Sequence, residues 1–512
     1  MQMILISILG VPAQGLVEVV RFVYTGKLRC TLGNITDVLL AATHLQVTEA
    51  IELCSHFLTS MTSTTNSVHM YNLADQFNLP HLCSKALKLI LENLQDVADR
   101  GDYVHFSEKF LAQILEDNRL QNVSELKLFE LALSWINYKP NDRVKFAFFL
   151  MSRIRLPLIP PHDLIDHVMS EPLMIKGDPQ CLDLVLEANK YHMLPDRQPN
   201  MQNLRTQVRA EAPSLVLMDI DDEGPRVLDL TTLRWGRLNI PRIEAYHAQV
   251  CTLQNYMYVC GGIDLFSSNN PISVKCLRVD PRFNSICEVQ PMEHFRHHFM
   301  LCSDGRSLFA IGGNCQGVYK SVVEQFVVKL RRWVTRRSMD HSVSAGAAVV
   351  LDNRIFVSGG QNERGIIRSM CRYNIKTDQW QDCPPMQHAR MDHFMCCSKQ
   401  KLYIIGGYDK NIARAFDVAT IETFDVETSQ WTSLSDPAPK LSGVESCQVG
   451  KCVYVAGGFS YDENRKRSEV WCYDVDTGEW TIIARLFAPN MSLPCCALFL
   501  PHHAVLDIDP NA

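Results

Sequence analysis

Apolar residues recur every three or four positions from about Gly15 to Tyr191, which is the spacing of a buried helix face. The segment "NVSELKLFELALSWI" shows this pattern clearly, with Ser124 placed as an N-cap. We therefore expect a stack of helices, and this helix should be buried on more than one side because its apolar stripe is wide. The stripe consists of Leu126, Phe129, Leu133 and Ile136, widened by Leu128, Leu131 and Trp135.

The period of the pattern changes near the middle of the chain. The segment from Tyr191 to Pro213 contains three prolines and many polar residues, which is typical of a connection between domains. After it, apolar and polar positions alternate as they do along β-strands. This segment is the expected boundary between a helical half and a β-sheet half.

The second half of the chain repeats itself. Each copy ends an apolar strand with two glycines: "YMYVCGG", "SLFAIGG", "RIFVSGG", "KLYIIGG" and "CVYVAGG". The copies recur about every 50 residues, which is the length of one four-stranded propeller blade. Such a blade buries both of its faces only by stacking with further blades. We therefore predict a β-propeller. The second glycines are 51, 47, 47 and 51 residues apart, at Gly262, Gly313, Gly360, Gly407 and Gly458.

A tryptophan follows three of the glycine pairs at a fixed place. The segments "NIKTDQW", "DVETSQW" and "DVDTGEW" end at Trp380, Trp431 and Trp480, which we expect to fill the space between neighbouring blades. The segment "DPRFNSI" has Ile286 at this place, so the second blade should pack more loosely. At the start of this half, "DLTTLRW" has the same spacing without a glycine pair, and "CCALFL" near the end is a lone strand.

These glycine pairs and trailing tryptophans resemble the kelch repeat. In kelch propellers a C-terminal strand completes the first blade and leaves no exposed sheet edge. The resemblance therefore implies six blades, with the first closed by residues 495–500.

The helical half resembles two other modules. The segments "GLVEVVRFVYTGKL" and "VLLAATHLQVTEAIELCSHFL" resemble the C-terminal half of a BTB domain, and "SVHMYNLADQFNLPHLCSKALKLILENL" with "RIRLPLIPPHDLIDHVMSEPL" resembles a BACK domain. The chain is thus similar to the BTB-BACK-kelch (kelch-like) family. The implied fold is multidomain, α followed by all-β: a BTB remnant at 1–60, BACK at 61–190, a linker at 191–212 and a six-bladed kelch propeller at 213–506, with glycine pairs near 261, 312, 359, 406 and 457.

The resemblance implies a non-catalytic adaptor of a cullin-3 RING ubiquitin ligase, in which the propeller binds the protein to be ubiquitinated. It places a cullin contact at Val68, Tyr71 and Asn72, with packing inside the helical half as the alternative role. Family BTB domains have a further block before the position where this chain begins, so we expect impaired cullin-3 binding, and a homodimer only where that domain is complete. The alternative function is an actin-associated or other scaffold without ligase activity.

Composition narrows the functional classes. With 50 basic and 56 acidic residues the formal net charge is −6, which gives no general attraction to nucleic acid or to acidic membranes. No stretch approaches the about 20 apolar residues of a membrane span, and we expect a cytoplasmic or nuclear protein. The nineteen cysteines are scattered without a C-x-x-C pair, so we expect reduced thiols, no metal site and no cofactor.

The loops after the glycine pairs are the expected binding surface. They are rich in arginine and aromatic residues, which dominate protein-binding hot spots, although single loop charges are commonly just solvated. If these cations converge, an acidic or phosphorylated segment of a partner protein is the expected ligand. The candidates are Arg364, Arg368, Tyr408, Arg414, Phe459, Tyr461, Arg465 and Arg467.

Two connections between blades share a motif. "MEHFRHH" and "MQHARMDH" place Arg296 near His298 and Arg390 near His393, and both arginines join the binding candidates. A histidine cluster can bind a metal, but recurrence at the repeat period favours a structural or rim role. Enzymatic propellers are a poor match, because the S-x-D-x-G-x-T-W boxes of sialidases do not occur in the sequence.

Overall fold

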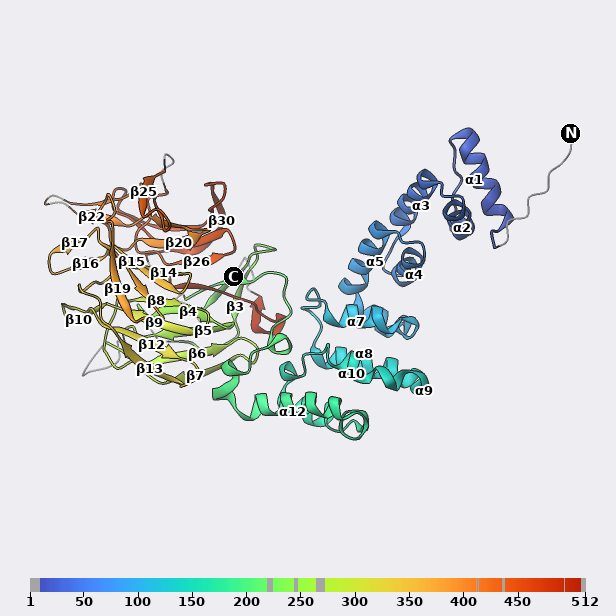
Figure 1. Cartoon of the computed structure of the whole chain (residues 1–512), viewed down its shortest axis with the longest axis horizontal. Coiled ribbons are helices and arrows are strands. Elements are labelled where there is room, and N and C mark those ends of the chain that lie inside the picture. The colour runs from blue at the N-terminus through green and yellow to red at the C-terminus, as the bar shows by residue number, and fades with distance from the viewer. Residues whose placement is uncertain are drawn as a thin grey trace. The chain divides into compact units, whose positions relative to one another are not determined.

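The computed structural model describes residues 10–218, 224–243, 247–263, 272–410, 412, 414–434, 438–491 and 493–507. Helices occupy the N-terminal part of the ribbon and strands the C-terminal part (Figure 1). The chain divides into two compact units, Met1–Ile154 with Lys176–Cys181, and Arg155–Ile175 with Leu182–Ala512. Over the described residues, no helix has both the length and the apolar character needed to cross a membrane.

The first helices of the N-terminal unit share one apolar core. Gly15 lies where the first two helices meet, because a Cβ added there would be 2.0 Å from the Asp37 carbonyl oxygen. Val19, Val38, Cys54 and Leu58 are fully buried in this core. The helices are α1 (Ala13–Thr25), α2 (Ile35–His44), α3 (Thr48–Met61), α4 (Ser67–Gln76) and α5 (Pro80–Glu92).

The N-cap and the broad buried face predicted for the segment "NVSELKLFELALSWI" are confirmed. The helix α8 (Glu125–Tyr138) starts after Ser124, whose Oγ accepts a hydrogen bond from Lys127 N at 3.3 Å. Its buried side chains include Leu128, Phe129, Leu131, Trp135 and Ile136. The other helices are α6 (Leu94–Asp99), α7 (Glu108–Glu116), α9 (Pro140–Arg143), α10 (Ala147–Met151), α11 (Pro161–Asp163) and α12 (Pro179–Met193).

The strands form the six predicted blades. Each blade has four strands, here termed A to D from the central channel outward. The A strands contact one another in a closed ring, and the last contacts the first. In ring order they are β31 (Cys495–Leu498), β4 (Gln249–Leu253), β8 (Met300–Ser303), β14 (Ala347–Leu351), β20 (Phe394–Ser398) and β26 (Ser446–Val449).

The B, C and D strands follow in each blade. Blade 1 has β1 (Ser214–Leu217), β2 (Arg226–Asp229) and β3 (Trp235–Leu238), and blade 2 has β5 (Tyr256–Cys260), β6 (Cys276–Asp280) and β7 (Ser285–Val289). Blade 3 has β9 (Ser307–Ile311), β12 (Val323–Val327) and β13 (Arg332–Arg336), and blade 4 has β15 (Arg354–Ser358), β18 (Met370–Asn374) and β19 (Gln379–Cys383). Blade 5 has β21 (Lys401–Ile405), β24 (Glu422–Asp425) and β25 (Gln430–Ser433), and blade 6 has β27 (Cys452–Ala456), β29 (Arg465–Asp474) and β30 (Trp480–Asn490).

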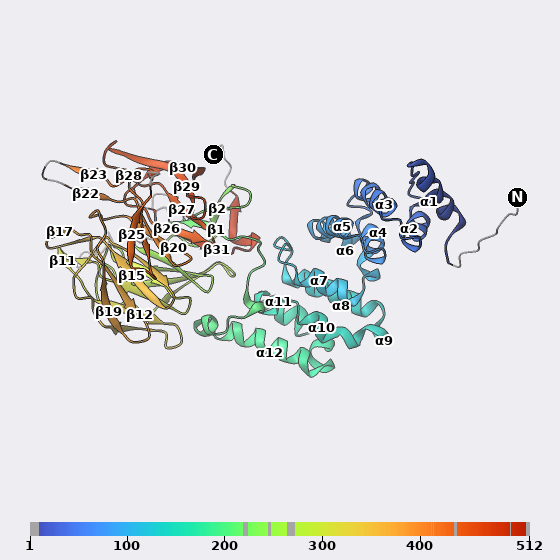
Figure 2. The ribbon, with the colours of Figure 1, turned by 45° about the horizontal axis from the view of Figure 1, so that its top comes forward.

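The C-terminal strand closes the ring, as predicted. β31 pairs antiparallel with β1, with Val216 opposite Cys496, and Figure 2 shows the two strands side by side. An additional strand, β32 (Val505–Asp507), pairs with β3 at the outer edge of the same blade. The first blade therefore combines both ends of the propeller segment.

Two of the three predicted tryptophans, Trp380 and Trp431, hydrogen-bond to a neighbouring blade, whereas the indole N–H of Trp480 has no hydrogen-bond partner among the described residues. The indole N–H of Trp431 donates to the Pro384 carbonyl oxygen at 2.8 Å, and that of Trp380 donates to the Arg337 carbonyl oxygen at 2.8 Å. Trp333 makes the same bond in blade 3, although its segment "VKLRRW" lacks the Asp and Thr of the other copies. The turn before Trp431 is shaped locally, because the Asp425 carboxylate accepts from the backbone N–H of Thr428 at 2.9 Å.

The propeller has two distinct faces. The loops between strands B and C lie beside the segments that connect one blade to the next. In these connecting segments, Ser344 forms a β-bridge with Gln361 of the loop in blade 4, and Met391 forms one with Tyr408 of the loop in blade 5. We call this the loop face. The A–B and C–D turns lie at the other ends of the strands and form the turn face.

The segment expected to be a linker packs on the turn face of blade 2. The hydroxyl of Tyr191, at the end of α12, lies 3.2 Å from that of Tyr256, and Gln202 Nε2 donates to the Tyr256 hydroxyl at 3.0 Å. Arg278 Nη2 donates to the Pro195 carbonyl oxygen at 2.9 Å. Residues 182–206 are thus part of the propeller unit, and the compact units divide upstream of the boundary suggested by the change of period.

Candidate partner-binding surface

The glycine pairs shape the loop face. Gly359 and Gly360 have φ values of 57° and 93°, which non-glycine residues rarely adopt. A Cβ on Gly360 would lie 2.6 Å from the Ser344 carbonyl oxygen. Beyond the pairs, short ribbons project: β10 (Asn314–Cys315) with β11 (Val318–Tyr319), β16 (Gln361–Asn362) with β17 (Gly365–Ile366), β22 (Tyr408–Lys410) with β23 (Ala415–Asp417), and β28 (Phe459–Ser460) with the start of β29.

The ribbon of blade 4 carries two exposed cations, Arg364 and Arg368. The carboxylate of the neighbouring Glu363 accepts a hydrogen bond from Ser342 Oγ at 2.9 Å. Within the described ranges, neither guanidinium group has an acidic partner within ion-pair distance. These two arginines therefore remain available to an anionic ligand.

Three aromatic candidates gather where blades 5 and 6 meet. The rings of Tyr408 and Tyr461 have centroids 4.1 Å apart, and Phe459 meets Tyr461 edge-on at 5.0 Å. All three side chains are half-buried. Burial and the neighbouring Tyr461 raise the pKa of Tyr408, so its hydroxyl is uncharged at neutral pH. Together they form an aromatic cluster at the loop face.

A buried carboxylate holds this aromatic cluster in place. Asp417 of β23 accepts hydrogen bonds from Ser460 Oγ at 2.7 Å, from Tyr461 N at 3.0 Å and from Asp462 N at 3.1 Å. The Asp417 side chain belongs to blade 5 and its partners to blade 6. It was not among the sequence candidates, because the contact joins residues more than 40 positions apart.

The other cationic candidates lie beside acidic side chains. Arg414 is 3.9 Å from Asp462, which also pairs with Lys440 at 2.8 Å. Arg465 and Arg467 both pair with Glu463, at 2.8 and 2.9 Å. The arginines of blades 5 and 6 therefore lie within ion-pair distance of carboxylates, whereas the structure gives no such pair for the two arginines of blade 4 among the described residues.

Arg296 and Arg390 are fully buried, which corrects their assignment to the binding surface. Arg390 Nη2 donates to the Glu422 carboxylate at 2.6 Å, and Nη1 donates to the Gly406 carbonyl oxygen at 3.1 Å. Arg296 makes the equivalent bonds to Glu324 and to the Gly312 carbonyl oxygen. Their guanidinium groups satisfy the carbonyls that the glycine turns expose inside the blade, so they cannot also reach a partner protein.

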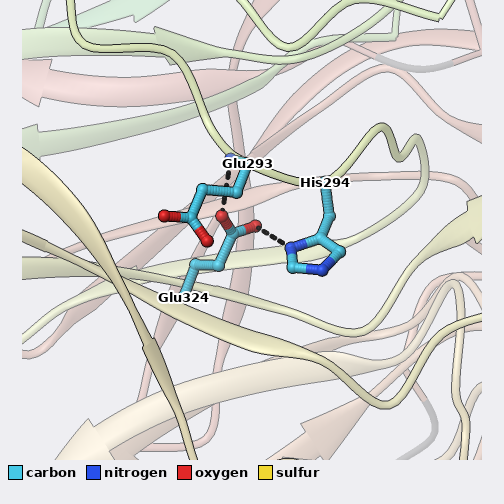
Figure 3. Close-up of side chains that lie close together, drawn as sticks. All are labelled: Glu293, His294 and Glu324. Atoms are coloured by element: carbon cyan, nitrogen blue, oxygen red, sulfur yellow. Dashed lines mark hydrogen bonds and ion pairs between the residues drawn. The ribbon is translucent and has the colours of Figure 1, made fainter.

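One group has the composition of a metal site. Potential ligand atoms of Glu293, His294 and Glu324 lie within 4.8 Å of one another (Figure 3). The Glu324 carboxylate, however, already accepts from Arg296 and from the backbone N–H of Glu293, the latter at 2.7 Å. Blade 5 repeats this arrangement, with Glu422 bound by Arg390. A guanidinium group thus takes the place that a cation would need, and the group is structural.

The two histidines of the repeated motif differ in environment. His393 is buried, its Nε2 lies 2.9 Å from Ser358 Oγ, and burial lowers its pKa to about 3. The pKa of His298 is lowered to about 4 by desolvation and by the adjacent His297 and His247. Both imidazoles are therefore neutral at physiological pH.

The cullin candidates lie on helix α4. Val68 is 8% exposed, and the ring of Tyr71 stacks on Phe110 with centroids 3.7 Å apart. Tyr71 also donates a long hydrogen bond to Gln113 Oε1 at 3.4 Å. Asn72 is exposed. Two of the three side chains therefore pack within the helical unit, and one is open to a partner.

Comparison with protein families agrees with this architecture. A family model described as the BTB/POZ domain matches residues 1–62, and one described as BTB And C-terminal Kelch, abbreviated BACK, matches residues 67–169. A third, described as the KLHDC2/KLHL20/DRC7 Kelch-repeats domain, matches residues 296–495.

Curated proteins resemble the chain over most of its length. Kelch-like protein 26 of Danio rerio is 29% identical over 511 residues, covering 97% of this chain and 84% of that protein. Kelch-like protein 36 of Bos taurus is 28% identical over 497 residues, covering 93% and 80%. Kelch-like protein 9 of Mus musculus is 29% identical over 504 residues, covering 87% and 81%.

Proposed function

Because the chain belongs to the BTB-BACK-kelch family, we propose that it recruits a target protein to a cullin-3 RING ubiquitin ligase. The loop face of the propeller binds the target, and the helical unit binds the cullin. In this role the chain forms and breaks no covalent bonds. It raises the effective concentration of the target lysine near the charged ubiquitin-conjugating enzyme.

The observation that supports target binding is the difference between the two faces of the propeller. Residues 191–206 cover part of the turn face at blade 2, where Gln202 and Pro195 make hydrogen bonds. The loop face instead exposes Arg364 and Arg368 and carries the aromatic cluster. Arginine and tyrosine are among the residues most enriched at the energetic centres of protein interfaces.

The charges favour an acidic or phosphorylated segment as the ligand. The guanidinium groups of Arg364 and Arg368 can each make two parallel hydrogen bonds to a carboxylate or phosphate. Arg414, Arg465 and Arg467 share the nearby carboxylates of Asp462 and Glu463 and contribute less net charge. The two arginines of blade 4 are therefore the principal anion contacts of the proposal, and the aromatic cluster supplies apolar contact area.

The cullin contact is proposed at the start of the BACK segment. Asn72 is the exposed residue of the three candidates, and Val68 and Tyr71 hold helix α4 in place. Replacement of Asn72 by Arg adds a long charged side chain to this surface without removing a packed group. Co-purification of cullin-3 with the full chain should fall in this variant, while its helical circular dichroism stays unchanged.

Target binding is tested with a double variant of the full chain, Arg364→Ala with Arg368→Ala. Capture of acidic and phosphorylated peptides from a displayed library should fall at least about tenfold, which is the loss expected for one or two charge-assisted contacts. The matched control is Arg306→Ala with Arg354→Ala, which removes two exposed arginines at the opposite ends of blades 3 and 4. Equal capture by both double variants would contradict the proposal.

A further inference from the structure

Two thiols of the helical unit lie in contact. Cys30 precedes helix α2 and Cys54 lies within helix α3. Their sulfur atoms are 3.8 Å apart. This is the distance of two touching sulfurs, and no bond joins them. The unit thus brings together two reduced cysteines from different elements.

The packing around the pair fixes this approach. Cys54 is fully buried in the apolar core, and Cys30 is half-buried against the same core. The chain next to Cys30 is held by Asn34, whose Oδ1 accepts from Thr31 N at 2.7 Å and whose Nδ2 donates to the Arg29 carbonyl oxygen at 3.1 Å. Residues on both sides of Cys30 are therefore anchored, and the contact between the sulfurs is part of the fold.

We propose that Cys30 and Cys54 form an intramolecular disulfide when the protein meets a peroxide. A disulfide has an S–S length of about 2.05 Å, so the sulfurs must approach by less than about 2 Å. The partly exposed Cys30 side chain has more freedom to make this movement than the buried Cys54 side chain. The pair is a modification site that the adaptor function does not require.

The chemistry proceeds in two balanced steps. The Cys30 sulfur, which a peroxide can reach, attacks one peroxide oxygen, forming a sulfenic acid and releasing water or an alcohol. The Cys54 sulfur then attacks the Cys30 sulfur, the S–S bond forms, and the hydroxyl leaves as water. Both thiols lose their protons, two sulfurs are oxidised and one peroxide is reduced.

The environment of the two thiols makes the reaction slow at neutral pH. Burial raises the pKa of both thiols, and the carboxylate of Glu18 on helix α1 adds to the rise at Cys30. Since the thiolate is the nucleophile, both groups are largely unreactive at neutral pH. The disulfide is therefore expected under sustained oxidation and not as a constant feature of the protein.

The test is a non-reducing peptide map of the full chain after prolonged treatment with hydrogen peroxide and alkylation of the remaining thiols. No lysine or arginine lies between Cys30 and Lys85, so trypsin leaves both cysteines in one peptide. Cleavage after Glu49 and Glu52 separates them. The expected product is a pair of peptides joined through Cys30 and Cys54 and released by a reductant.

Two variants complete the test. Cys30→Ser should abolish the linked product, whereas Cys83→Ser, which changes another half-buried thiol packed on the same core, should leave it unchanged. In the wild-type chain, the thermal transition of the helical unit should move upward on oxidation, because a cross-link restricts the unfolded state. Wild-type chain that accumulates sulfinic acid at Cys30, or that links Cys54 to Cys83, would overturn the proposal.

Discussion

Arg296 and Arg390 occupy equivalent positions in blades 3 and 5, each just before the residue that bridges to the ribbon of its blade. Each forms an ion pair with a glutamate on strand C of its blade. In the strand register, Glu324 lies opposite Ala310 of strand B, and Glu422 lies opposite Ile404 of strand B. A buried guanidinium group without a counter-charge would be costly. The two members of each pair therefore have to occur together.

Blades 4 and 6 support this coupling through their substitutions. The position of the arginine is occupied by Val343 in blade 4 and by Leu441 in blade 6. The position of the glutamate is occupied by Cys371 in blade 4 and by Trp471 in blade 6. In both blades the arginine and the glutamate are replaced together by uncharged residues. The coupling is visible in the sequence only after the register of the strands is known, which explains why burial of the arginines was missed.

Glu445 gives a pH-dependent prediction. Its carboxyl lines the central channel, a cavity of about 570 Å³, and accepts from Gln249 Nε2 at 2.8 Å. Burial raises its pKa from 4.5 to about 8, although this hydrogen bond opposes the rise. Because the folded-state pKa lies above the unfolded-state value, the associated stability is complete below about pH 4.5 and is lost as the pH rises through about 8.

Replacement by glutamine removes this ionisation and keeps the shape of the side chain. The variant Glu445→Gln should be more stable than the wild type by on the order of 4 kcal/mol at pH 8 and by less than about 1 kcal/mol at pH 5. Thermal melts of the propeller at the two pH values measure the difference. Glu288→Gln, at an exposed position of blade 2, is the control and should show no such dependence. Equal effects of Glu445→Gln at both pH values would show that its ionisation is not coupled to folding.

At the scale of elements, the glycine pair lets strand B end close to the segments that connect neighbouring blades. Gly360 has a positive φ, and a Cβ there would meet the Ser344 carbonyl oxygen. Gly305 also has a positive φ, but a Cβ there would meet nothing within 4 Å. Substitutions at these two glycines therefore distinguish the cost of backbone strain alone from the cost of strain together with a steric clash.

Alanine substitutions should reveal this separation. Gly305→Ala should cost about 1–2 kcal/mol of unfolding free energy, which is the strain of the left-handed conformation alone. Gly360→Ala should cost more than about 3 kcal/mol, because the backbone must also shift to relieve the contact. Chemical denaturation of the full chain, followed by tryptophan fluorescence, compares them. Similar losses for the two variants would mean that the close approach at Gly360 is unimportant.

The repeating elements were predictable because their causes are local. The glycine pairs located strand B in five blades, and residues such as Asp425 and Trp431 located the turn and strand D. The segment "CCALFL" located the strand that closes blade 1. These features depend on short segments whose conformation or burial is set by a few neighbouring residues.

Other elements depend on contacts between distant parts of the chain. The packing of Tyr191 and Gln202 on Tyr256 joins segments more than 50 residues apart, and residues 191–213, which include Tyr191 and Gln202, have the composition of a linker. The buried Asp417 likewise has a role only because the ribbons of blades 5 and 6 meet. No periodic signal marks such residues before the blades are assembled.

At the scale of the whole molecule, the closed ring makes the loop face a stable platform. Pairing of β31 with β1 joins the ends of the propeller, so the ribbons of blades 4, 5 and 6 keep their spacing. The helical segment of the propeller unit packs on the turn face, through Tyr191 and Gln202. In the proposed function, target binding and ligase binding therefore fall to different parts of the chain.

The most direct test of the proposed function measures ubiquitination of the captured proteins. Cells express the full chain or its Arg364→Ala with Arg368→Ala variant, with and without cullin-3, and ubiquitin-modified peptides are quantified in proteins labelled by proximity to the propeller. We expect modification of a common set of these proteins to fall both when the arginines are replaced and when cullin-3 is removed. Modification that persists in both cases would contradict the assignment of the chain as a cullin-3 adaptor acting through its loop face.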